Sequence, residues 1–80
     1  MQFIQEQAKE IGDRLGIDWN IIPLEQFLLG INVELEHGLR DPQTNITNND
    51  PILTGKIAWA HLKEYSDYYD RLKEIEEENE

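Results

Sequence analysis

Residues 23–38 read PLEQFLLGINVELEHG and carry the clearest helical pattern of the chain. Apolar side chains recur there at steps of four, three and four, which is the spacing of one helix face: Leu24, Leu28, Ile31 and Leu35. Pro23 suits the first turn of a helix, because its missing N–H would have no partner there. Gly38 is typical of a helix end, so the pattern predicts a helix over about 23–37. Gly30 lies inside it at a cost of roughly 1 kcal/mol relative to Ala, which predicts a close helix crossing.

The same spacing predicts three further helices, at about 2–15, 51–65 and 67–77. Gly16 can end the first of them. Asp50 followed by Pro51 is the signature of a helix start, and Ser66 can cap the last helix. The pattern leaves open whether the last two segments are separate helices or one bent rod. The acidic run at 76–80 stands where negative charge opposes the helix dipole, which predicts fraying.

These segments predict an all-α fold, a compact bundle of three to four short helices that forms one domain over residues 1–80. Alternation typical of strands is almost absent. The apolar stripes predict the following buried side chains: Ile4, Ile11, Leu15, Leu28, Ile31, Leu35, Ile57, Leu62 and Leu72.

Composition narrows the classes of protein to which the chain can belong. It has 80 residues, enough for one domain, and no cysteine for a disulfide or a thiolate metal site. No apolar run approaches the length of a membrane span. The first residues lack the basic region and long apolar stretch of a signal peptide, so we expect a cytoplasmic location.

The charge is strongly negative, with 17 acidic and 7 basic side chains and a net charge of −10. Direct binding to nucleic acid or to an anionic membrane is disfavoured, because both need clustered Lys and Arg. A basic protein partner fits this charge, and one version of that idea is an acidic decoy that occupies a nucleic-acid-binding protein. The plain alternative is that the charge keeps a small domain soluble.

Two carboxylate–histidine pairs have the spacing of a metal site. Glu34 and His37 stand three apart in one predicted helix, and His61 and Glu64 stand three apart in another. Glu-x-x-His pairs on two helices build di-iron and di-manganese sites in helical bundles. The second pair here runs in reverse order and the two further glutamates of such a site are missing. We therefore expect no cofactor, and keep a divalent metal as the alternative.

A wider polar cluster follows from topology. Helices over 23–37 and 51–65 should pack as antiparallel neighbours, because the loop between them is about a dozen residues long. That packing predicts convergence of these side chains: Glu34, His37, Asn45, Asp50, Lys56 and His61. In one interpretation they hold the loop through mutual hydrogen bonds. In the other they line a binding site.

No nucleophile and base stand in a catalytic arrangement, so we expect a non-enzymatic binding or accessory module. The chain also resembles a known family over nearly its whole length. The resemblance lies in these stretches: Ile11 to Asp13, Leu15 to Trp19, Val33 to Gly38, Thr44 to Asn48, Asp50 to Ala58, Ala60 to Leu62 and Asp67 to Tyr69. The family consists of small uncharacterised domains of bacterial and bacteriophage proteins, and it implies no activity.

Overall fold

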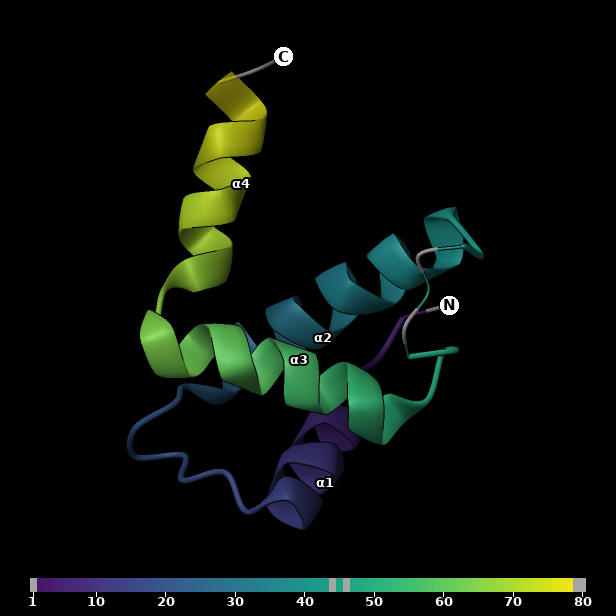
Figure 1. Ribbon diagram of the computed structural model, residues 1–80. Helices are drawn as coiled ribbons and strands as arrows, with labels where there is room; N and C mark the ends of the chain where they lie inside the picture. Colours follow the sequence, from purple (N-terminus) through teal and green to yellow (C-terminus); the bar gives the residue numbers. More distant parts are fainter. Residues whose placement is uncertain (1, 44, 46, 79–80) are drawn as a thin grey trace.

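The computed structural model describes residues 2–43, 45 and 47–78, and in this part of the chain all regular structure is helical (Figure 1). The four helices are α1 (Gln5–Leu15), α2 (Leu24–Arg40), α3 (Pro51–Glu64) and α4 (Tyr68–Glu78). The predicted all-α class is confirmed. None of these helices is both long and apolar enough to cross a bilayer.

Helices α1, α2 and α3 form the body of the molecule. The α2 and α3 helices run roughly antiparallel and share an extensive interface, and α1 packs against both of them (Figure 1). The core contains Ala8, Ile11, Phe27, Ile31, Leu35, Ala58, Leu62 and Tyr69. Helix α4 leaves the C-terminal end of α3 and projects away from the body, so its first turns make its contacts with α2 and α3 (Figure 1).

The N-terminal segment differs from the prediction. Helix α1 begins at Gln5 and not near residue 2, and Ile4 is 59% exposed while its neighbour Phe3 is buried. The cause is Asn32 on α2, whose side chain bonds both backbone groups of Phe3, the N–H at 2.7 Å and the carbonyl at 3.1 Å. These two bonds hold the segment extended against α2, and the Phe3 ring turns into the core in place of Ile4.

Helix α2, by contrast, is longer than predicted. It continues through Gly38 to Arg40. Gly38 has an ordinary negative φ, and its role is to leave room for the following loop: a Cβ atom there would lie 2.8 Å from Oδ1 of Asn45. The sequence analysis interpreted Gly38 as the end of the helix, whereas this glycine lies where the loop side chain of Asn45 approaches the helix closely.

Other helix ends agree with the prediction within a residue or two. Gly16 ends α1 with a left-handed φ of 82°, and Asp50 caps α3 by accepting bonds from Ile52 N at 2.8 Å and Leu53 N at 3.1 Å. Extended backbone at Tyr65 separates α3 from α4. Helix α4 extends to Glu78, beyond the start of the predicted fraying, and the rest of that prediction lies outside the described residues.

Most of the predicted core is correct. Four of its members are buried: Ile11, Ile31, Leu35 and Leu62. Four more are partly buried: Leu15, Leu28, Ile57 and Leu72. Only Ile4 is wrong, for the reason given above.

Candidate functional site

Glu34 is the centre of the polar contacts between α2, α3 and α4. Its side chain is only 12% exposed. Oε2 accepts a 2.7 Å hydrogen bond from the hydroxyl of Tyr69 on α4, and lies 3.9 Å from Nε2 of His61 on α3. Oε1 lies 3.9 Å from Nδ1 of His37, one turn further along α2. One carboxylate therefore faces side chains from three helices.

Tyr69 is the side chain through which α4 is attached. It is 1% exposed, and its ring packs on Gly30, where an added Cβ atom would lie only 2.5 Å from the ring. The glycine inside α2 therefore makes room for a side-chain ring, where the sequence predicted the close crossing of another helix. Burial raises the pKa of Tyr69 above its ordinary value of 10.0, and the hydrogen bond to Glu34 and the charge of that carboxylate raise it further. We call Gly30, Glu34 and Tyr69 the tyrosine site.

Two more rings pack at this junction, one from α3 and one from α4. His61 stacks on Tyr68 with ring centres 4.3 Å apart, and Tyr69 stands edge-on to both rings. The helix is fixed further by Gln26, whose Nε2 donates to Asp70 at 3.0 Å. The junction thus combines ring packing with hydrogen bonds, and its chemistry is that of an attachment point for α4.

The loop between α2 and α3 is held by its own side chains. Asn45 Oδ1 accepts bonds from the hydroxyl of Thr47 at 3.2 Å and from the backbone N–H of Asn48 at 3.0 Å, and its Nδ2 donates to Asn49 at 3.1 Å. Asn48 and Asn49 have left-handed φ values of 54° and 67°, which asparagine tolerates better than most residues. Thr44 and Ile46 lie outside the described residues.

The predicted cluster is therefore divided. Glu34, His37 and His61 meet, whereas Asn45 bonds within the loop and Asp50 serves as a helix cap. Within the described part of the chain no hydrogen bond or ion pair joins Lys56 to any of them. That Glu34, His37 and His61 also bind a ligand stays a prediction.

A metal would use the same three side chains together with Glu64. Among residues 2–43, 45 and 47–78, however, no three histidine, aspartate or glutamate side chains have the arrangement of a metal site. Oε2 of Glu34 is already bonded to Tyr69. Neutral imidazole and carboxylate would suit Zn²⁺, Fe²⁺ or Mn²⁺, and such an ion would require the junction to rearrange.

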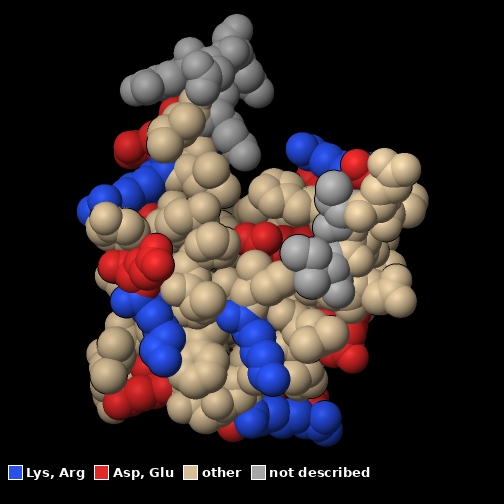
Figure 2. All heavy atoms as spheres, viewed as in Figure 1, with Lys and Arg blue, Asp and Glu red and all other residues tan. Residues whose placement is uncertain are grey.

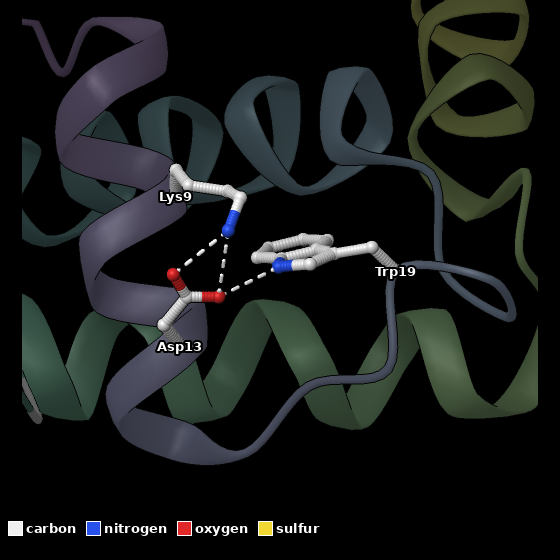
Figure 3. A network of polar contacts seen from close by, with 3 residues as sticks. All are labelled: Lys9, Asp13 and Trp19. Carbon is white, nitrogen blue, oxygen red and sulfur yellow. Dashed lines mark hydrogen bonds and ion pairs between the residues drawn. The ribbon is translucent and has the colours of Figure 1, made fainter.

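A second ring lies on a helical glycine of α1. The indole of Trp19, in the connector between α1 and α2, covers Gly12, and its Nε1 donates to Oδ1 of Asp13 at 2.8 Å (Figure 3). Lys9 donates to the same carboxylate at 2.8 Å. These two donors, with Lys9 the stronger, lower the pKa of Asp13 below its ordinary value of 3.8. We call Gly12, Asp13 and Trp19 the tryptophan site.

An apolar groove of about 510 Å³ lies between this connector and the C-terminal end of α3. Its buried floor includes Ile22 and Leu62, and its lining includes Ile21, which is 71% exposed, and the partly buried Trp59. The ammonium of Lys63 lies 4.6 Å from the centre of a Trp59 ring. We call this the Trp59 groove.

Sequence reasoning missed Tyr69 and the Trp59 groove as distinct features. A usable pattern for Tyr69 was present: a glycine inside a helix, with a carboxylate one turn later, marks room for a ring with a polar tip. The groove had no comparable pattern, because Ile21 and Trp59 are far apart in the sequence.

The described part of the chain thus forms four helices, with a nearly buried carboxylate where α4 is attached. Residues 8–78 match the family described as "Protein of unknown function (DUF5661)", and the chain belongs to that family. No curated protein and no solved structure matches the chain.

Proposed function

We propose that this chain is a non-enzymatic binding module that holds a basic segment of another protein. The observation that carries the proposal is how its positive charges are placed. Four cations pair with acids four residues away in the sequence: Lys9 with Asp13, Arg14 with Glu10, Arg40 with Glu36 and Arg71 with Asp67, at N–O distances of 2.8 to 3.5 Å.

These local pairs leave the excess of negative charge unchanged. Each pair joins one acid to one base, so all ten excess negative charges remain on side chains outside the pairs. Figure 2 shows several Lys and Arg side chains beside Asp or Glu on one face. A field of this sign attracts basic partners over several ångströms and speeds their association. We also propose that the module acts in the cytoplasm, and that it comes from a bacterium or a bacteriophage, as the resemblance noted above implies.

The test is capture at graded salt. The immobilised chain should retain basic proteins at 50 mM NaCl and release them steeply by 500 mM, because salt screens exposed charges. A triple variant tests whether the negative charge causes the capture. It carries Glu6→Gln, Glu25→Gln and Glu74→Gln, which neutralise exposed acids of α1, α2 and α4. It should capture less of the same proteins. Capture that neither salt nor the triple variant changes would overturn the proposal.

An acidic decoy is the narrower version of this function. Five of the last seven residues are glutamates, which gives the chain a dense negative end. If the captured partner binds nucleic acid, duplex DNA should compete with the chain for it. A partner that holds the chain and DNA at once would exclude the decoy.

The metal alternative rests on Glu34, with His37 and His61 each 3.9 Å from one of its oxygens. Metal analysis of untagged protein, purified with and without added Zn²⁺ or Mn²⁺, tests it. A stoichiometric ion that is lost in His61→Ala would support it. Less than a tenth of an equivalent, on the order of background, would remove it.

A further inference from the structure

We infer that the Trp59 groove is the docking site for a short segment of a partner protein that carries a large apolar side chain next to a lysine or arginine. This inference rests on the proposed function, since it names the surface and the kind of segment that the binding module takes.

The apolar half of the argument concerns Ile21. It is the most exposed large apolar side chain in the described part of the chain, at 71%, and it lines the same groove as the buried Ile22 and Leu62. An apolar side chain placed in the groove would cover Ile21 and rest on that floor. Removing apolar surface from water favours such docking by roughly 25 cal/mol per Å².

The polar half concerns Trp59, because its indole already holds a cation. Lys63 Nζ lies 4.6 Å from the ring centre, and tryptophan is the side chain whose face attracts cations most strongly. Asp18 and Glu64 are both exposed and also line the groove, so its charged residues are two acids and the lysine on the ring. A partner's lysine or arginine can replace Lys63 on the indole and lie near these carboxylates.

Charge decides between this occupant and the others. A second copy of the chain would bring another ten negative charges to the groove, and nucleic acids and anionic membranes are repelled in the same way. A basic segment is attracted both by the whole molecule and by the acids of the groove. Lys63 then acts as a stand-in for the partner's cation, and the partner must displace it.

The first experiment uses this competition. The probe is a fluorescein-labelled amphipathic peptide built of leucine and lysine, and its binding is measured by fluorescence anisotropy at 50 mM NaCl. Lys63→Ala should tighten binding about fivefold, since roughly 1 kcal/mol of competing cation–π contact is removed. Lys56→Ala is the matched control, because it removes an exposed lysine of the same helix outside the groove. An equal effect of both variants would show that net charge alone matters.

The second experiment tests the apolar half. Ile21→Ser should weaken binding of the same peptide about tenfold, because a large apolar contact is lost. Leu39→Ser changes a side chain that is 52% exposed on α2, away from the groove, and should leave binding unchanged. Circular dichroism melts confirm that each variant is folded.

The outcomes separate the inference from the proposed function. One outcome is that the peptide binds in a salt-sensitive way and that Ile21→Ser and Leu39→Ser weaken its binding equally. This outcome would overturn the groove as the docking site, but it would leave the proposed module for basic partners unaffected. No binding by 1 mM peptide, on the order of the weakest specific contacts, overturns the groove as well. Equal binding of an uncharged leucine–glutamine peptide would show a groove that takes apolar segments without regard to charge, contrary to the inference.

Discussion

Two sites in this molecule are built on one plan. In each, an aromatic ring lies on a helical glycine and donates a hydrogen bond from its polar atom to a nearby carboxylate. The members are Gly12, Asp13 and Trp19 in the tryptophan site, and Gly30, Glu34 and Tyr69 in the tyrosine site. Both bonds are short, at 2.8 and 2.7 Å, so distance does not distinguish them.

Burial distinguishes the two sites. The Asp13 side chain is 51% exposed and is shared with Lys9, whereas Glu34 is 12% exposed and Tyr69 is almost fully buried. Water can replace Trp19 as a donor to Asp13, but it cannot readily replace Tyr69 at Glu34. A buried acceptor that loses its donor carries the full desolvation penalty. The same hydrogen bond should therefore matter much more where α4 is attached than where the connector meets α1.

The largest effect is expected when the ring of the tyrosine site is removed. Tyr69→Ala should lower the free energy of unfolding by about 3–5 kcal/mol, the usual cost of truncating a buried aromatic ring. Urea unfolding followed by circular dichroism measures it. Tyr65, four residues earlier in the sequence, is 51% exposed and provides the control, so Tyr65→Ala should stay within about 0.5 kcal/mol. Equal costs at the two positions would show that α4 is not held through Tyr69.

A smaller effect is expected when only the hydroxyl is removed. Tyr69→Phe should cost about 1.5–3 kcal/mol, because the nearly buried carboxylate of Glu34 loses its donor. Trp19→Phe removes the corresponding donor at the tryptophan site and should cost less once the smaller ring is allowed for. If the two substitutions lower the free energy of unfolding equally, burial does not determine how much each hydrogen bond contributes to stability.

The raised pKa of Tyr69 predicts a loss of stability at alkaline pH. The folded state keeps the phenol proton to higher pH than the unfolded state, so this contribution is complete below pH 10 and falls as the pH rises further. The slope should be about 1.4 kcal/mol per pH unit. Unfolding midpoints in urea at pH 9 and pH 11 measure it. Tyr69→Phe should lack this part of the dependence, and an unchanged dependence in that variant would assign it to other groups.

The smallest effect is expected at Asp13. Its pKa is lowered, so its contribution to stability is present above the ordinary value and disappears as the pH falls through the lowered one. A carboxyl NMR titration measures the pKa directly. Lys9→Ala should raise it more than Trp19→Phe does, because the bond from Lys9 is the larger cause. The reverse order would mean that the indole dominates this carboxylate.

The helices themselves could be read from the sequence, because their cause is local. Apolar spacing located the α2 stripe that buries Ile31 and Leu35, and the Asp50–Pro51 pair located the start of α3. The burial of Phe3 in place of Ile4 could not be predicted in this way. It depends on Asn32, 29 residues away, whose side chain bonds the backbone of Phe3.

The site was only partly predictable for a geometric reason. Antiparallel packing of α2 and α3 correctly brings Glu34 near His61. Lys56 and His61 are five residues apart, which rotates them by roughly 140° about the axis of α3, so both cannot face Glu34. The choice among three neighbouring tyrosines had no local cause at all, because only packing against Gly30 selects Tyr69 for burial.

The central claim is that burial makes the bond between Tyr69 and Glu34 the attachment of α4. A double-mutant cycle with Tyr69→Phe and Glu34→Ala, measured by urea unfolding, tests it most directly. We expect a coupling free energy of about 1.5 kcal/mol or more that persists in 1 M NaCl. The parallel cycle with Trp19→Phe and Asp13→Ala should give a smaller coupling that salt weakens. A coupling at the tyrosine site within about 0.3 kcal/mol of zero, or one no larger than that at the tryptophan site, would contradict the claim.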